Sequence, residues 1–316
     1  MFHNIKLGAL VAGIIALSAP VAKAETFINI LTGGTSGVYY PLGVALSEIY
    51  GQNMADTRVQ VQSTKASVEN LNLLQQGRGE LAFALGDSVK DAWEGNADAG
   101  FKAPLSKLRA IAAIYPNFIQ IAALKDANAT TITDLKGKSI SVGAAKSGTE
   151  LNARKIFDAA GMSYDDLGKV EYLPFSESVE LMKNRQLDAT FQSSGLGNAA
   201  LKDLSTTQDV TFVAIPADIA DKLGAPYKPG VIPAGTYPGQ DADVPTVAIT
   251  NILVTQSDVS DEEAYQMTKL LFENLDTLKA AHAAAGGISL EAAIQGLPIP
   301  LHPGAEKYYK EKGLIK

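Results

Sequence analysis

Residues 27–49 read FINILTGGTSGVYYPLGVALSEI and join two kinds of hydrophobic pattern. Residues 27–31 form a short apolar run, which is typical of a buried β-strand. A glycine-rich turn follows, and Pro41 then falls in the first turn of a helix, where a missing N–H group costs little. The apolar face of this helix carries Val38, Leu42, Ala45, Leu46 and Ile49. The segment therefore predicts a strand, a loop and a helix in succession.

The same alternation continues downstream. Residues 59–62 are a second short strand, and Val68, Leu71 and Leu74 mark the helix after it. Residues 81–85 are a third, fully apolar strand. Strands that alternate with helices in this way favour a parallel sheet with right-handed crossover connections.

The pattern starts again in the second half of the chain. Residues 108–115 and 118–124 are expected to be two strands, divided by Pro116-Asn117. A second alternating unit follows, with further strands at 139–143, 170–173, 187–191 and 210–215 and with a helix whose apolar face carries Ala153, Ile156, Phe157 and Ala160.

The last part of the chain returns to the first unit. Residues 226–245 hold five prolines and are expected to be irregular. Residues 247–254 are a strand, and the chain is helical from Ser260, where Ser260 and Glu263 form a capping box. The doubled pattern predicts an α/β fold of two lobes, with parallel-rich sheets, flanking helices and extended crossover strands. Residues 25–115 and 252–316 are expected in lobe I, and residues 116–251 in an inserted lobe II.

Composition excludes several classes of function. The chain has 316 residues, no cysteine, three histidines and a formal charge of −7. The absence of cysteine excludes disulfides, a thiolate nucleophile, iron–sulfur clusters and the common zinc sites. An acidic chain with five arginines lacks the basic surface of a nucleic-acid binder, so no nucleic-acid partner is expected.

Residues 1–24 have the pattern of a secretory signal peptide. An apolar run at 7–19 is too short to span a bilayer, and Ala22-Lys23-Ala24 is an A-x-A cleavage pattern. An N-terminal membrane anchor is the alternative. Cleavage after Ala24 leaves a mature chain of 316 − 24 = 292 residues. That chain loses Lys6 and Lys23 but no acidic residue, so its charge is 25 − 34 = −9. Because no other apolar run approaches the length of a membrane span, we expect a periplasmic protein that does not insert into the membrane.

Loops rich in glycine, serine and threonine precede one predicted helix in each lobe. Thr35 and Ser36 follow the first strand, at the edge of the sheet where open α/β folds place ligands. Ser147-Gly148-Thr149 opens a helix of the second unit in the same way. A tight turn capped by Ser36 is the alternative for the first loop. Because the same kind of loop precedes a helix in both lobes, the pattern favours a small anion held by two helix N-termini.

Further residues could extend this site. Thr64 and Ser67 flank a third helix start, and Asn70 lies one turn later. Tyr39 and Tyr40 follow the first loop, and one of them is placed to close over a ligand. The nearby cations that could attract an anion to an acidic protein are Lys65, Lys146 and Arg154.

Candidates for catalysis are few. The chain has no Gly-x-Ser-x-Gly motif, and the contexts of His282 and His302 favour packing and turn roles. We therefore expect no catalytic residue, no cofactor and no metal. Two alternatives to a transport function stay open. One is an exported, dehydratase-like enzyme that uses Asp87 with Lys65 or Lys146, and the other is a ligand sensor without transport.

Five segments of the mature chain resemble the TAXI-type (TRAP-associated extracytoplasmic immunogenic) solute receptors of TRAP transporters. They are residues 31–41 (LTGGTSGVYYP), 67–71, 134–138, 143–153 and 232–241 (IPAGTYPGQD). The resemblance implies a two-lobed periplasmic-binding-protein fold of type II. It also implies delivery of the ligand to TRAP permease subunits driven by an ion gradient. Similar receptors bind glutamate, glutamine or dicarboxylates such as 2-oxoglutarate, so a small carboxylate ligand is implied.

The resemblance also implies the ligand contacts, which map to Thr35, Ser36, Tyr39, Ser67, Asn70, Ser147, Gly148 and Thr149. One departure concerns the end of the third strand, where the family often has Val-Gln-Ser-Asp and this chain has Ala84-Leu85-Gly86-Asp87. The change removes hydrogen-bonding groups near the cleft while Asp87 is retained as a candidate. Ser193 and Ser194, after the 187–191 strand, are expected to form a further wall of the cleft.

Overall fold

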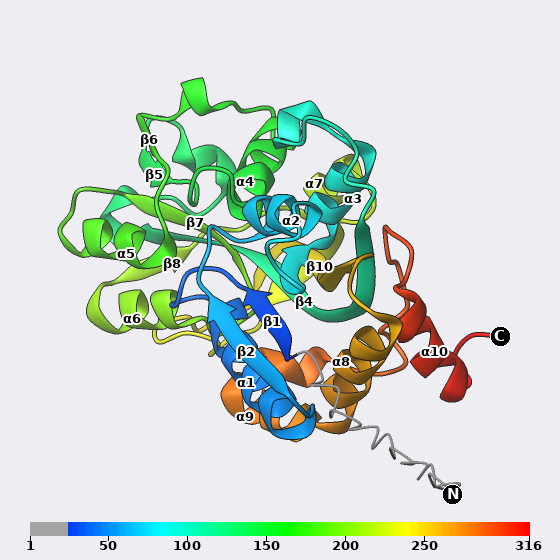
Figure 1. The fold of residues 1–316 in the computed structure, drawn as a ribbon. Coiled ribbons are helices and arrows are strands. Elements are labelled where there is room, and N and C mark those ends of the chain that lie inside the picture. The colour runs from blue at the N-terminus through cyan, green and yellow to red at the C-terminus, as the bar shows by residue number, and fades with distance from the viewer. Residues whose placement is uncertain (1–24) are drawn as a thin grey trace, which may run out of the picture.

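The computed structural model describes residues 25–316, and its helices surround one continuous sheet (Figure 1). The predicted signal peptide, residues 1–24, lies outside the described residues. The strands are β1 Thr26–Leu31, β2 Thr57–Gln62, β3 Leu81–Leu85, β4 Leu108–Leu124, β5 Ser139–Ser141, β6 Lys169–Glu171, β7 Ala189–Ser194, β8 Val210–Phe212, β9 Lys228–Ile232 and β10 Val244–Gln256.

The helices follow the strands in the alternating order that the sequence predicts. They are α1 Tyr39–Asn53, α2 Ser67–Gln75, α3 Gly86–Glu94, α4 Gly148–Ala159, α5 Phe175–Lys183, α6 Ala199–Thr207, α7 Ala217–Leu223, α8 Asp261–Glu273, α9 Leu275–Ala281 and α10 Pro303–Glu311. The predicted capping box of α8 is confirmed, since the hydroxyl of Ser260 accepts from the backbone N–H of Glu263 while the Glu263 carboxylate accepts from that of Ser260.

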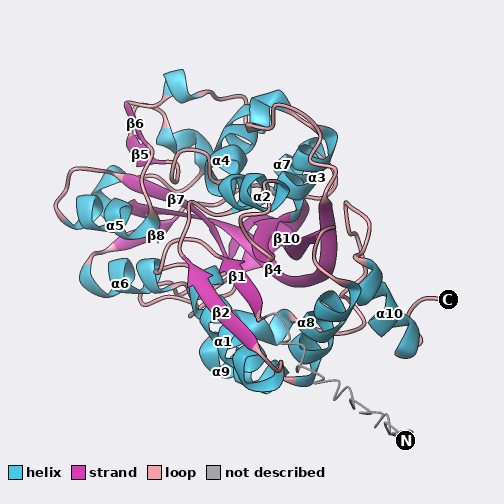
Figure 2. Ribbon diagram, in the orientation of Figure 1, coloured by secondary structure: helices cyan, strands magenta, loops and turns pink. Residues whose placement is uncertain are grey.

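The sheet is mixed, and its strand order is β2-β1-β3-β10-β4-β7-β5-β6 (Figure 2). Parallel pairs occur at both ends of this order, among β1, β2 and β3 and among β5, β6 and β7. The long strands β4 and β10 pair antiparallel in the middle and connect the two parallel groups. The fold class predicted from the sequence, an α/β fold with flanking helices and extended crossover strands, is confirmed.

Strand β4 corrects the prediction of two separate strands. It runs unbroken through Pro116, which lies opposite Thr250 of β10. The register between the strands shifts next to this pair, between Thr250 and Ile252. Pro116 is exposed and lies next to this irregularity, where a residue without an N–H group is tolerated in a strand. The chain therefore passes from one group of strands to the other without a break.

Residues 226–245 are also more regular than expected. Within them, β9 pairs antiparallel with the first residues of β10, and Pro229 lies opposite Val247. A proline is tolerated there because β9 pairs with β10 alone and so forms an edge. Gly230 allows close packing, since a Cβ atom on it would lie 3.1 Å from the Cβ of Ala248.

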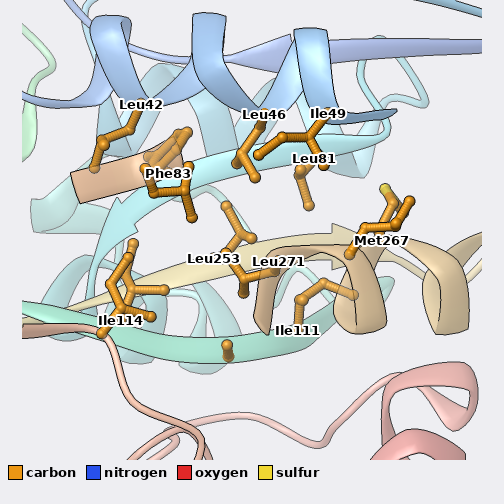
Figure 3. Close-up of a cluster of buried hydrophobic side chains, with 14 of the residues drawn as sticks. Leu42, Leu46, Ile49, Leu81, Phe83, Ile111, Ile114, Leu253, Met267 and Leu271 are labelled. Atoms are coloured by element: carbon orange, nitrogen blue, oxygen red, sulfur yellow. The ribbon is translucent and has the colours of Figure 1, made fainter. Parts of the chain in front are cut away.

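Two separate hydrophobic clusters support the division into lobes. In the first, Leu42, Leu46 and Ile49 of α1 point towards Phe83 of β3 and Leu253 of β10, while α8 covers the same sheet (Figure 3). The second cluster packs around Ile140, Phe157 and Phe191, and it covers β5 and β7. We propose to keep the lobe boundaries at 115/116 and 251/252, because Pro116 and Thr250 face each other where β4 and β10 cross between the lobes.

Candidate functional site

A cavity of about 250 Å³ lies between the two lobes. Its walls come from the carboxyl ends of strands in both lobes. Gly33 and Gly34 follow β1, Leu85 ends β3, Ala144 follows β5, and Ser193 and Ser194 end β7. This edge of a parallel sheet is where α/β folds bind ligands, because the following helices begin there.

Helix starts surround the cavity. The first residues of α1, α2, α4 and α5 or the residues just before them line it, and Leu85 precedes α3. The first N–H groups of a helix have no partner within the helix and carry a partial positive charge. Several such starts aimed at one cavity make a site that favours an anion.

The side chains of the cavity have the same preference. Eleven lining residues carry hydroxyl groups. Four of these hydroxyls donate their proton within the protein, and the others can donate hydrogen bonds to anionic oxygens; the four are those of Tyr39, Ser63, Thr64 and Ser193. Among the lining residues that the structure describes, Lys65 is the single charged one, and none is Asp or Glu. An acidic chain thus keeps its carboxylates away from this cavity.

Two residues with strained backbones precede these helix starts, one in each lobe. Ala66 (φ +69°) precedes α2, and Lys146 (φ +64°) precedes the N-cap residue of α4, Ser147. The hydroxyl of Thr64 accepts from the backbone N–H of Ala66 at 2.9 Å and thereby supports the first of these turns. Asp56, Asn128 and Arg185 have the same conformation outside the cavity, so this strain adds to the evidence of the helix starts but does not by itself mark the site.

Eight of the twelve residues suggested by the sequence line the cavity. They are Thr35, Tyr39, Thr64, Ser67, Ser147, Thr149, Ser193 and Ser194. The other four, Ser36, Asn70, Asp87 and Gly148, lie outside the lining. Of the three cations proposed to attract an anion, Lys65 lines the cavity. Lys146 is exposed outside it, and Arg154 is paired with Glu150 at 2.7 Å.

Asn70 supports the site from behind. Its amide Nδ2 donates to the carbonyls of Thr32 at 2.7 Å and Phe83 at 2.9 Å, and its Oδ1 accepts from the Thr64 hydroxyl at 2.6 Å. All three interactions stay within the first lobe. Asn70 therefore fixes the loop that carries Thr64 and leaves ligand contact to its neighbours.

Asp87 lies in a contact between the lobes. It is buried, and its Oδ2 accepts from Tyr227 Oη at 2.6 Å and Asn152 Nδ2 at 2.8 Å. Lys155 Nζ of α4 lies 3.2 Å from Asp87 and 2.7 Å from Asp91 of α3. Desolvation opposes the charge on Lys155, but the attraction of Asp87 and Asp91 outweighs it and raises the pKa of Lys155. The sequence placed Asp87 at the ligand, whereas α3 turns its carboxylate towards α4.

The structure adds site residues that the sequence did not suggest. Tyr115 and Asn117 of β4 and Phe175 and Ser176 of α5 line the cavity. Tyr115 was interpreted as part of a buried strand, and Phe175 follows a proline, so neither carries a local signal of ligand contact. Pro116, between Tyr115 and Asn117, is the one local irregularity in the sequence at this point, and it predicts a break between strands and no ligand contact.

The arrangement defines a class of protein. Two α/β lobes joined by a pair of long strands, with a cavity between them, form the type II periplasmic-binding-protein fold. Within this class, the chain belongs to the NMT1-like family, whose model matches residues 30–313.

Solved structures share this fold at low sequence identity. PhnD1 from Prochlorococcus marinus, in complex with methylphosphonate, is 12% identical, covers 92% of this chain and 100% of its own, and has a TM-score of 0.58. The alkanesulfonate-binding protein SsuA from Xanthomonas axonopodis pv. citri, bound to MOPS, is 14% identical, covers 93% and 96%, and has a TM-score of 0.52. A binding protein component of an ABC phosphonate transporter from Pseudomonas aeruginosa is 12% identical, covers 84% and 80%, and has a TM-score of 0.53.

The assignment to the TAXI-type receptors was wrong. The family that matches is the NMT1-like family, and these similar structures are sulfonate- and phosphonate-binding proteins. Two of the five segments behind the assignment, residues 31–41 and 143–153, are turns rich in glycine, serine and threonine that lead from a strand into a helix. Such turns occur in many α/β folds, so they indicate the fold more than the family.

No helix within residues 25–316 is both long enough and apolar enough to cross a membrane.

Proposed function

We propose that the protein is an exported solute-binding protein that encloses a small organic anion between its lobes and passes it to a membrane transporter. One observation carries the proposal: helix starts from both lobes and eleven hydroxyl groups converge on one cavity that contains a lysine and no carboxylate. Export rests on the signal peptide predicted at residues 1–24.

The cavity favours an oxyanion with a small apolar group. Hydroxyls and helix N-termini suit the several oxygens of a sulfonate or phosphonate, while Val38, Leu85 and Phe175 offer apolar surface. An α-amino acid also carries an ammonium group, and the described lining holds no carboxylate to pair with it. The glutamate- or glutamine-like ligand expected from the sequence therefore has less support than a sulfonate or phosphonate. A dicarboxylate such as 2-oxoglutarate is the competing candidate.

Closure of the lobes is the mechanism. Strands β4 and β10 connect the lobes and serve as the hinge, while Ser67 and Ser147 offer donors to the ligand from the first and second lobe. A ligand that contacts both lobes shifts the equilibrium towards the closed state, because it binds that state better. The closed form then presents both lobes to the membrane partner. The relation to ABC phosphonate and sulfonate systems favours an ABC-type importer as that partner.

The alternative of a dehydratase-like enzyme has little support, because a carboxylate and a lysine do not lie together at the cavity. A dehydratase-like reaction needs a carboxylate and a lysine at the ligand. Lys65 lines the cavity, but Lys146 lies outside it and the carboxylate of Asp87 is buried in the contact between the lobes. The sensor alternative uses the same site, and the identity of the membrane partner separates it from transport.

Calorimetry on the mature protein tests the proposal. We expect methylphosphonate or methanesulfonate to bind more tightly than glutamate, glutamine or 2-oxoglutarate, and to be recovered unchanged after incubation. A micromolar ligand at millimolar concentration should stabilise the fold by about 4 kcal/mol, visible as a higher Tm. Tight binding of an amino acid would overturn the ligand class. Chemical conversion of the ligand would overturn the binding-protein assignment.

A further inference from the structure

Tyr115 stands out among the residues of the cavity. Its side chain is fully buried, yet its hydroxyl has no hydrogen-bond partner among the residues that the structure describes. The residue lies in β4, the strand that connects the lobes, and it lines the cavity. A buried hydroxyl without a partner costs about 1–3 kcal/mol, so buried polar groups are almost always paired.

Tyr115 is closely packed against two glycines. A Cβ atom on Gly195 would lie 3.1 Å from its Cε2, and one on Gly287 would lie 3.2 Å from its Cβ. The backbone carbonyl of Tyr115 accepts a hydrogen bond from Asn251 Nδ2 at 3.0 Å. Because the hydroxyl is itself buried and Tyr115 lines the cavity, a ligand in the cavity is the available candidate for the missing partner.

Tyr39, the tyrosine that the sequence suggested, is differently engaged. Its hydroxyl lies 2.6 Å from Oδ1 of Asn251. The orientation of the Asn251 amide is fixed, because its Nδ2 donates to the carbonyl of Tyr115, a group that can only accept. Tyr39 therefore donates its proton to Asn251, and its hydroxyl oxygen can only accept a hydrogen bond from a ligand in the cavity. Of the two phenols at the cavity, Tyr115 has the free proton, and burial raises its pKa so that this proton is retained at neutral pH.

We propose that Tyr115 is a ligand-contacting residue whose hydroxyl donates a hydrogen bond to an anionic oxygen of the ligand. The inference rests on the proposed function and deepens it, since it names the donor that completes the site from the strand connecting the lobes. It also predicts that the ligand places an acceptor, and not an alkyl group, against Tyr115.

The test compares Tyr115→Phe with Tyr309→Phe. Tyr309 is a matched control, because it is equally buried but donates to the carbonyl of Ile111 at 2.8 Å and lies in the core. Calorimetry with methylphosphonate and methanesulfonate gives affinities, and thermal unfolding without ligand gives Tm. We expect Tyr115→Phe to weaken binding tenfold or more without lowering Tm. Tyr309→Phe should lower Tm and leave Kd within twofold of the wild-type value.

Three outcomes would count against the inference. If wild-type protein binds a probe and Tyr115→Phe binds it equally well, Tyr115 makes no ligand contact and the proposed function stands. If Tyr115→Phe lowers Tm as much as Tyr309→Phe, the hydroxyl has a partner within the protein and the inference is wrong. If wild-type protein binds neither probe, the proposed ligand class fails and the inference fails with it.

Discussion

Gly148 of the second lobe touches Ser67 of the first so closely that a Cβ atom on Gly148 would lie 2.6 Å from Ser67 Oγ. The same atom would lie 2.7 Å from Leu85 Cδ1. Gly148 and Ser67 are the first residues of α4 and α2, so two helix starts meet across the cleft. The structure therefore shows the lobes in contact, and that contact depends on the missing side chain at position 148.

The substitution Gly148→Ala is expected to hinder closure. Since the added methyl group has no space, the lobes must separate, and we expect ligand affinity to fall at least tenfold, or about 1.4 kcal/mol. Calorimetry with the tightest-binding probe measures the loss. Gly51→Ala is the matched control, because nothing lies within 4 Å of a Cβ atom at Gly51 and alanine favours the helix there. Equal affinities of the two variants would show that closure does not need the contact.

Local pattern accounts for most of the fold. The strand β3 is apolar and buried throughout, and helix α1 buries the positions that its periodicity predicts. The pattern fails where pairing across the sheet overrides local chemistry. Pro116 suggests a break in the sequence of β4, although β10 pairs with the strand there, and the prolines in and around β9 obscure an edge strand. The choice of partner strand is set by tertiary contacts that no local window contains.

The ion pair between the lobes gives a second prediction. Lys155→Met leaves Asp87 and Asp91 without their cation, and breaking a fully buried pair costs about 3–5 kcal/mol. Because Lys155 remains partly exposed, we expect a smaller loss, about 2 kcal/mol, in urea unfolding. Lys90→Met is the control, since its pair with Glu94 is exposed and should contribute about 0.3–0.5 kcal/mol.

The pH dependence of this pair has a definite sign. The pKa of Lys155 is raised, so its contribution is full below the ordinary lysine value near 10.5. It should be lost only as the pH rises through the raised pKa. A difference between wild type and Lys155→Met that disappears between pH 7 and pH 9 would contradict this assignment.

Lys65 is expected to contribute modestly to ligand affinity. It is the one charged residue of the described lining, but it is exposed, so water and salt screen its charge. We expect Lys65→Met to weaken anion binding about two- to fivefold, as for exposed ion pairs, and to reduce the dependence of Kd on salt. Lys102→Met is the control, since Lys102 lies outside the cavity. A hundredfold loss would mean that Lys65 becomes buried against the ligand on closure.

The sequence predicts the candidate site residues that lie on loops, but it does not predict those that lie on strand β4. The sequence predicts Thr35, Ser147 and Thr149 as site residues because glycine and hydroxyl residues cluster there between a strand and a helix. Tyr115 and Asn117 belong to β4, and only the crossing of that strand between the lobes brings them to the cavity. Asp87 is the converse case. Its position after β3 suggests ligand contact, but its place on α3 directs the carboxylate towards Lys155.

His302 gives the last prediction, which concerns stability below neutral pH. Its Nδ1 accepts from the N–H of Gly304 at 3.2 Å and caps α10, while Nε2 lies 3.0 Å from the carbonyl of Val259, which requires a proton there. Protonation of the ring would place a proton on Nδ1 and abolish the cap, whereas the Nε2–H contact would persist, so only the neutral ring makes both contacts. Burial lowers the pKa of His302 and, in the same way, that of His282.

The stability that these histidines contribute should be full above the unfolded pKa near 6.5 and be lost as the pH falls towards their lowered values. The unfolded chain then binds protons that the folded chain does not, and each histidine lowers stability by at most about 1.4 kcal/mol per pH unit. We expect His302→Asn, which keeps a good N-cap residue, to reduce the loss of unfolding free energy between pH 7 and pH 5, and His302→Asn with His282→Asn to reduce it further. Urea unfolding at the two pH values measures the difference. A double variant that loses as much stability as the wild type would show that carboxylates, and not these two rings, govern the response.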